Sequence, residues 1–196
     1  MAFNKQGLKN LWANPQLRFI GLFLCLSGFF YIFNTAYIGI TAKGGAYIPF
    51  LDKYLNYIRW WRDFDIELSA TILRWLGYTV ITNDYQLKVV GLAGFKLVYT
   101  CLGYGIMGVF AAFVLAFPKP FKQKIGFLLF GLLLIQALNI ARFVLISIFW
   151  TGKDFLWGID HHNFFNTIVY AILIVTVFFW IKRSERNTQN SPINKN

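Results

Sequence analysis

The sequence predicts an all-α membrane protein, a polytopic bundle of transmembrane helices. Of its 196 residues, 57% are hydrophobic and only 14% are charged. In a soluble domain, about a quarter of the residues are charged. The apolar residues gather in long runs, and many of the Lys and Arg residues gather in the segments that flank these runs. Long apolar runs flanked by basic segments are typical of proteins that cross a bilayer several times.

Four runs are long and apolar enough to predict membrane-spanning helices, which need about 20 residues. They cover residues 19–40, 102–117, 125–150 and 164–181. A fifth run, 66–82, is shorter and holds Arg74 near its middle, so we expect an interfacial, re-entrant or spanning helix there. We expect 1–183 to form a single integral membrane domain, and 184–196, rich in Asn and Ser, to be a disordered cytoplasmic tail.

The distribution of the net charge of +11 predicts the orientation of these helices. Basic clusters precede the first run, fill the short loop 118–124 and follow the last run. This is the pattern of short cytoplasmic loops rather than of a nucleic-acid groove. The first and third runs are then expected to run outward and the second and fourth to run inward. Residues 42–99 are expected to lie on the outer side.

This topology predicts that three reactive groups reach the outer level of the bilayer. Cys101 precedes the second run, and His161 and His162 precede the fourth. Arg142 stands 18 residues beyond Lys124, roughly 27 Å along a helix, and the bilayer core is about 30 Å thick. A thiol, a guanidinium and an imidazole are therefore expected at one level.

Cys101 allows two interpretations. A free cysteine is most often a small buried hydrophobic residue. Cys101, however, stands at the start of a predicted helix, where the positive end of the helix dipole favours the nucleophilic thiolate. Cys25 lies in the middle of the first run, so we expect neither a reactive role for it nor a disulfide with Cys101.

Gln136, Asn139 and Arg142 recur at three-residue steps and share one broad helical face. Such a face is costly to expose to lipid, so we expect it to point into a polar interior. The alternative for Arg142 is an arginine whose head group snorkels to the interface. Because Gln136 and Asn139 share its helical face, a functional role is favoured for Arg142.

The segment 160–163 reads Asp-His-His-Asn and allows three interpretations. It could be a solvated helix N-terminus with Asp160 as the N-cap, a metal site, or a general base. Adjacent histidines without a nearby third ligand are a weak signal for zinc. A helix N-terminus helps to keep an imidazole neutral and able to accept a proton, so a general base is favoured.

Gly103, Gly105 and Gly108 form a G-x-G-x-x-G pattern at the start of the second run. A dinucleotide-binding loop would need a strand before it and a βαβ unit around it, and this apolar run has neither. The glycines are instead expected to let neighbouring helices approach closely.

The order of these residues resembles the exosortase and archaeosortase family of membrane-embedded cysteine transpeptidases. The likeness covers residues 88–181 and rests on three features: the Cys101-x-Gly103 step, the Asn139-x-x-Arg142 pair and a histidine that opens the last span.

Two details refine this resemblance. Many members carry a serine after the cysteine, and Leu102 stands there in this chain. Members often show a small residue four positions after the histidine. Asn166 stands four residues after His162, so His162 aligns better than His161 with the histidine of the family.

The resemblance implies an enzyme of the bacterial cytoplasmic (inner) membrane with an outward-facing active site. Its substrates would be secreted proteins with a C-terminal motif, a transmembrane helix and a basic cluster. Cys101 would form a thioester with the substrate, and Arg142 would stabilise the oxyanion or orient the thiolate. His162 would transfer protons, and Asn139 would orient the substrate. The acceptor would be a surface glycan or a lipid, and the reaction would require neither a metal nor an organic cofactor.

Two other functions fit the same residues. In a non-enzymatic assembly or export partner, Arg142 and the histidines would only pair helices. In a metal-dependent intramembrane hydrolase, His161 and His162 would be ligands. A transporter is less favoured, because transporters bind their substrates near the midplane of the bilayer.

Overall fold

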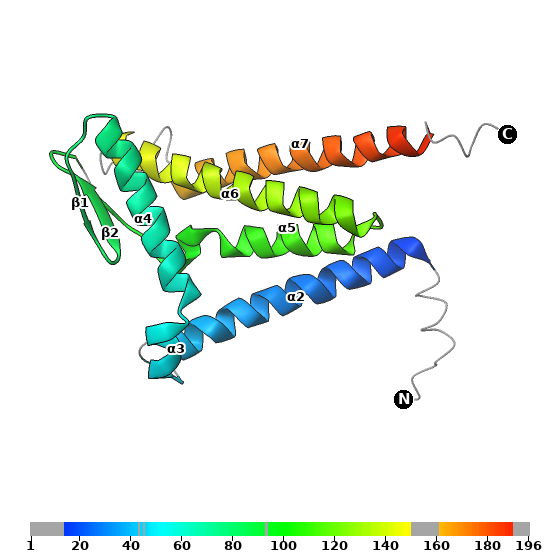
Figure 1. The fold of residues 1–196 in the computed structure, drawn as a ribbon, viewed down its shortest axis with the longest axis horizontal. Helices are drawn as coiled ribbons and strands as arrows, with labels where there is room; N and C mark the ends of the chain where they lie inside the picture. The colour runs from blue at the N-terminus through cyan, green and yellow to red at the C-terminus, as the bar shows by residue number, and fades with distance from the viewer. Residues whose placement is uncertain (1–13, 43, 45, 93, 150–160, 190–196) are drawn as a thin grey trace.

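Long helices lying side by side form the body of the protein, and a crosswise layer closes one end of it (Figure 1). The computed structural model describes residues 14–42, 44, 46–92, 94–149 and 161–189, and of 161–163 and 184–189 it describes the backbone alone. The body consists of α2 (Pro15–Thr41), α5 (Tyr104–Ala116), α6 (Phe121–Phe149) and α7 (His161–Gln189). In chain order, each of these helices contacts the next. The predicted helical bundle is confirmed.

Three described helices are long and apolar enough to cross a membrane, over Pro15–Thr41, Phe121–Phe149 and Phe164–Arg183. The second predicted run, 102–117, forms the shorter helix α5. Its 13 residues extend for only about 20 Å, whereas the apolar core of a bilayer is about 30 Å thick. The helix is shorter than the apolar run because Leu102 belongs to a separate 3₁₀ turn, η1 (Tyr99–Leu102), and Gly103 breaks the chain direction before α5.

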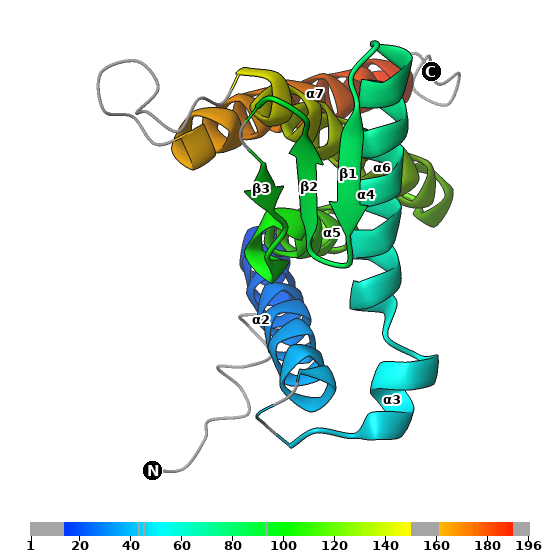
Figure 2. The ribbon, with the colours of Figure 1, turned by 90° about the vertical axis from the view of Figure 1, so that its left-hand side faces the viewer.

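The crosswise layer begins with α3 (Pro49–Tyr54) and continues with α4 (Tyr57–Trp75). Figures 1 and 2 show α4 running across the ends of the long helices rather than parallel to them. Apolar residues at helical spacing, among them Ile58, Ile66 and Leu73, are buried on one face of α4. The predicted fifth run therefore does not form a helix parallel to the four others, because its first ten residues, 66–75, belong to α4.

A small antiparallel sheet lies beyond α4, and the sequence did not lead us to expect it. Its strands are β1 (Val80–Asn83), β2 (Gln86–Val89) and β3 (Phe95–Lys96), in the order β1-β2-β3. The Asn83 side chain accepts hydrogen bonds from the backbone N–H groups of Tyr85 and Gln86, at 2.9 and 2.8 Å, and so closes the β1-β2 turn. Leu87 and Val89 point inward and pack in one cluster with residues of α4 and α6.

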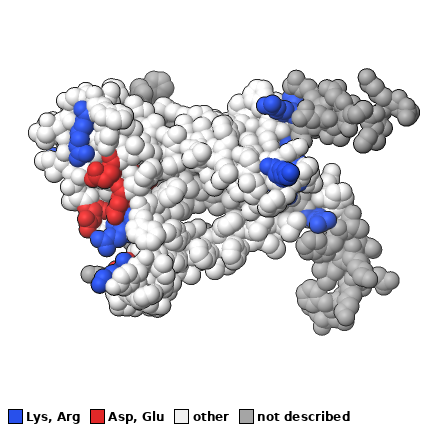
Figure 3. Space-filling model, viewed as in Figure 1, with Lys and Arg blue, Asp and Glu red and all other residues white. Residues whose placement is uncertain are grey.

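The two ends of the molecule differ in charge (Figure 3). We call β1, β2 and the turn between them the hairpin. All five acidic residues with described side chains lie within residues 52–84, in the crosswise layer and the hairpin, and we call this side of the molecule the hairpin end. The hairpin end also carries basic residues: Lys53, Arg59, Arg62, Arg74, Lys88 and Lys96. At the opposite end, which we call the basic end, the described charged side chains are all basic: Arg18, Lys119, Lys122, Lys124, Lys182 and Arg183. This separation of charge agrees with the basic clusters seen in the sequence.

The last helix is longer than its apolar segment. α7 continues to Gln189, so the first six residues of the predicted disordered tail, 184–189, are helical. Residues 190–196 lie outside the described part of the chain.

Glycines permit close packing between the long helices. This confirms the prediction for Gly108 but not for Gly103 and Gly105, where an added Cβ atom would meet nothing closer than 3.8 Å. A Cβ atom at Gly108 would lie 3.2 Å from Cβ of Phe30 in α2. A Cβ atom at Gly131 in α6 would lie only 2.1 Å from the Phe110 ring of α5. The pairs α2–α5 and α5–α6 can therefore pack this closely only because Gly108 and Gly131 have no side chain.

Candidate active site

Cys101 lies at the hairpin end of the bundle, in the short turn η1. Its side chain is buried, with 7% of the residue exposed, and it packs in one apolar cluster with Ile66 of α4 and Phe143 of α6. The thiol is free, as is that of Cys25. We expected Cys101 in the first turn of the following helix. The structure places it one short turn earlier, because the chain must change direction at Gly103 before α5 begins.

Gly103 makes this change of direction possible. Its φ angle is +77°, in the left-handed region that favours glycine. Its carbonyl then accepts the hydrogen bond of the Met107 N–H at 3.0 Å, in the first turn of α5. The position of the Cys101 turn relative to α5 therefore depends on a conformation that other residues adopt only at a cost.

Replacing Gly103 with alanine should destabilise the protein by about 1–2 kcal/mol, the cost of a left-handed conformation for an L residue. A Cβ atom there would meet no atom closer than 3.8 Å, so the cost comes from the backbone and not from a clash. Gly105→Ala is a matched control, because its Cβ would meet nothing within 4 Å and its φ angle is not in the left-handed region. Thermal unfolding in detergent measures both, and equal melting temperatures for the two variants would contradict this account.

The predicted polar stripe of α6 faces the interior, and each of its residues binds a different element. Gln136, Asn139 and Arg142 are all buried. The Nδ2 group of Asn139 donates a hydrogen bond to the Cys101 carbonyl oxygen at 3.1 Å. Nη1 of Arg142 donates to Oδ1 of Asn166 in α7 at 3.4 Å. α6 thus connects the Cys101 turn with the first turns of α7.

The two histidines stand at the start of that same helix, since α7 begins at His161 and His162 follows. Their side chains lie outside the described part of the structure, as does Asp160, the predicted N-cap. Asn166, the partner of Arg142, lies four residues, about one helical turn, after His162. The structure therefore brings Cys101 to Asn139 directly, and it brings Arg142 to the helix that carries the histidines.

Gln136, the third residue of the stripe, binds Asp65, which the sequence did not lead us to expect at the site. Its Nε2 group donates a hydrogen bond to Oδ1 of Asp65 in α4. Asp65 is fully buried, and this burial raises the pKa of its carboxyl from 3.8 to about 7, against the opposing effect of the Gln136 hydrogen bond. The helical spacing of Arg62, Asp65 and Ser69 with the apolar residues of α4 could have revealed this inward face.

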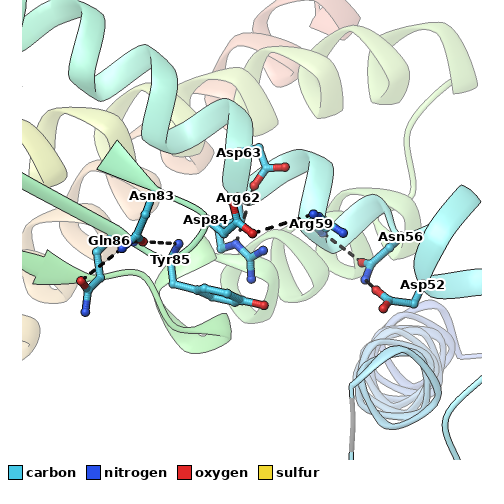
Figure 4. A network of polar contacts seen from close by, with 9 residues as sticks. All are labelled: Asp52, Asn56, Arg59, Arg62, Asp63, Asn83, Asp84, Tyr85 and Gln86. Atoms are coloured by element: carbon cyan, nitrogen blue, oxygen red, sulfur yellow. Dashed lines mark hydrogen bonds and ion pairs between the residues drawn. The ribbon is translucent and has the colours of Figure 1, made fainter. Parts of the chain in front are cut away.

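Polar contacts fasten α3, α4 and the hairpin to one another at this end (Figure 4). Nη2 of Arg59 lies 3.9 Å from Oδ2 of Asp84 in the β1-β2 turn. The Arg59 backbone N–H donates to the Asn56 side chain at 3.0 Å, and Nδ2 of Asn56 donates to Asp52 in α3 at 2.8 Å. These contacts place the hairpin next to α4.

A cavity of about 300 Å³ lies between α4, the hairpin and the segment that leads into the Cys101 turn. Arg62 and Tyr85 form one wall, with the guanidinium carbon 4.0 Å from the centre of the tyrosine ring, and residues 96–99 form the other. A second hollow of about 480 Å³ adjoins it, since Tyr85 and Lys96 line both. A chain bound along these hollows would lie next to the segment that ends at Cys101.

The described side chains show what the site offers for chemistry. They include no group of three or more His, Cys, Asp or Glu residues close enough to bind one metal ion, and the two histidine side chains are not among them. The groups that the structure does place are a buried thiol, a buried guanidinium and an amide that holds the backbone of the thiol residue.

These features define a multi-pass helical membrane protein with a buried cysteine at one end of its bundle. Comparison with known families identifies it further: residues 10–179 match the family of transmembrane exosortases. Because the match covers most of the chain, the protein belongs to the exosortase family, and this membership supports a role as a membrane transpeptidase or protease. No curated protein and no solved structure matches the chain.

Proposed function

We propose that this protein is a cysteine transpeptidase that cleaves the C-terminal sorting signal of secreted proteins and transfers them to an acceptor. The observation that carries the proposal is the hydrogen bond from Asn139 to the Cys101 carbonyl. It joins the turn that bears the thiol to the helix that bears Arg142. The family membership supplies the class of reaction.

In the proposed reaction, the Cys101 thiolate attacks the carbonyl carbon of the scissile peptide bond. Arg142 stabilises the negative charge on the tetrahedral oxygen or orients the thiolate. His162, or His161, donates a proton to the leaving amine as the carbon–nitrogen bond breaks, and a thioester remains on Cys101. An acceptor nucleophile then gives up its proton to the histidine and attacks the thioester, the carbon–sulfur bond breaks, and the Cys101 thiolate and the protonated histidine are restored.

Asn139 has a more specific role in this mechanism than the resemblance alone implies. Its amide already donates to the backbone of Cys101, so it orients the nucleophile, and through it the substrate carbonyl that the nucleophile attacks. We propose the outer face of a bacterial cytoplasmic membrane as the location of the site. The separation of the basic end from the hairpin end supports this orientation, because basic loops stay in the cytoplasm.

A covalent adduct tests the proposal. The chain would be co-expressed with a secreted protein that ends in a short motif, a transmembrane helix and a basic cluster. When the reaction of the original protein is quenched with acid during turnover, mass spectrometry should detect a substrate adduct at Cys101. Loss of the histidine that protonates the leaving amine should prevent this adduct from forming. Parallel His161→Ala and His162→Ala variants would show which histidine serves the thiol. An adduct that persists in Cys101→Ala would refute the mechanism.

A further inference from the structure

Asp65 of α4 accepts a hydrogen bond from Gln136 of α6 and so joins the two helices. Its Oδ1 accepts from Nε2 of Gln136, and Oε1 of Gln136 accepts from the indole Nε1 of Trp61 at 3.2 Å. Because an indole N–H can only donate, Trp61 determines which way the Gln136 amide points. The NH₂ group of that amide is therefore turned toward Asp65. Through this arrangement α4 is bonded to α6, across 71 residues of sequence.

Stability alone does not account for a carboxyl at this place. Asp65 is 0% exposed, and within the described part of the chain its Oδ2 atom has no hydrogen-bond partner. Buried polar atoms are normally satisfied. Well-packed apolar residues of similar volume often stabilise a protein as well as a buried polar pair does, or better. A buried titratable group that weakens the fold is a candidate for a functional role.

The Cys101 turn lies between the two helices that Asp65 joins. On one side, Ile66 of α4, the residue after Asp65, packs in the same cluster as Cys101. On the other side, Asn139 of α6 donates to the Cys101 carbonyl at 3.1 Å. Asn139 stands about one helical turn after Gln136. The bond between Asp65 and Gln136 therefore joins the two helices that lie on either side of the Cys101 turn.

We propose that Asp65 is a positioning residue of the candidate active site, which acts through Gln136 to hold α4 and α6 at the spacing that places the Cys101 thiol. Its effect on turnover rests on the proposed function, whereas its effect on the thiol itself rests on the geometry alone. Two experiments separate these claims.

The first experiment measures the reactivity of the thiol without any substrate. The full chain, carrying Cys25→Ser so that Cys101 is its one thiol, is reacted with iodoacetamide in lipid nanodiscs. Asp65→Leu loses the acceptor for Gln136 and should let α4 and α6 move apart, so alkylation of the buried Cys101 should rise several-fold. Asp65→Asn keeps an oxygen acceptor and should restore the original rate. Glu67→Leu, on the exposed side of the same helix, is the matched control and should change nothing.

Equal alkylation rates in the original protein, Asp65→Leu and Asp65→Asn would overturn the proposal. This holds whether or not the protein is a transpeptidase. If the original protein formed no substrate adduct at Cys101, the proposed function would fail, and the alkylation rates would still decide the role of Asp65.

The second experiment separates positioning from stability. In Trp61→Phe/Asp65→Leu/Gln136→Leu all three hydrogen-bonded side chains are replaced by apolar ones, so none of their polar groups is left without its partner. The melting temperature should therefore equal or exceed that of the original protein. A displacement of about 1 Å at a reacting group can lower a rate by about 10²-fold, so kcat should fall by about that factor while KM changes little. Recovery of kcat together with the melting temperature would show that Asp65 serves the fold alone.

Discussion

Replacing Cys101 with alanine should abolish processing of a secreted substrate, and replacing it with serine should lower kcat/KM by about 10³-fold or more. Alanine has no nucleophile, and a serine hydroxyl is a much weaker nucleophile than a thiol near neutral pH unless a base activates it. The measurement is the fraction of substrate that loses its C-terminal helix in cells that express each variant, read by mass spectrometry. Purified enzyme then gives kcat/KM.

Cys25→Ser is the matched control for this prediction, because Cys25 is an exposed residue in the middle of α2. It should process substrate like the original protein. The melting temperatures of all variants must also be compared, since Cys101 is part of a packed cluster. Full processing by a folded Cys101→Ala variant would rule out the cysteine mechanism. If a chelator then stopped the reaction, the metal-dependent hydrolase would become the better explanation.

Asp65→Asn should stabilise the protein above pH 7 and remove a pH dependence that the original protein shows. The pKa of Asp65 is about 7 in the folded state, against an ordinary value of 3.8. Between these values the folded protein holds a proton that the unfolded chain has lost. The free energy of unfolding therefore falls as the pH rises from about 4 to 7, and this loss is complete above pH 7. A shift of this size corresponds to as much as about 4 kcal/mol.

Thermal unfolding in detergent between pH 5 and pH 8.5 would measure this effect. The melting temperature of the original protein should fall over the lower part of this range, and that of Asp65→Asn should fall less. Asp63→Asn is the control, because the Asp63 side chain is half exposed and its carboxyl lies near Arg62 at 3.9 Å rather than in the core. Parallel pH curves for the original protein and Asp65→Asn would show that Asp65 does not titrate in this range.

α6 emerges as the element that organises the site. Three polar residues on one of its faces bind α4, the Cys101 turn and α7 in turn. In an apolar bundle, a polar stripe is stable only where partners from other helices satisfy it. Because the polar side chains of α6 must find partners away from lipid, α6 binds both the Cys101 turn, through Asn139, and α7, through Arg142.

Much of this arrangement could be predicted from local properties of the chain. Long apolar runs specify helices that cross a membrane, and basic clusters specify which of their ends lie together. Helix length then predicts that Arg142 lies near the level of Cys101. The three-residue spacing of Gln136, Asn139 and Arg142 predicts an inward polar face, and burial of all three confirms it.

The crosswise layer could not be predicted in this way. The strands of the sheet have only two to four residues each, too few for a clear alternating pattern. α4 mixes charged and apolar residues, so its composition fits an interfacial helix as well as a distorted span. Its direction across the bundle depends on contacts with the sheet that follows it and with α6, which lies far away in sequence.

The sequence by itself determined the membrane helices, the separation of charge between the ends of the bundle, and the order of cysteine, arginine and histidine along the chain. Each of these follows from the solvation of residues near to one another in sequence. Only the tertiary structure decided that Cys101 occupies a separate turn, that Asn139 holds its carbonyl, and that Asp65 is buried against Gln136. These features arise where three elements meet, so no single segment of the chain contains the groups that stabilise them.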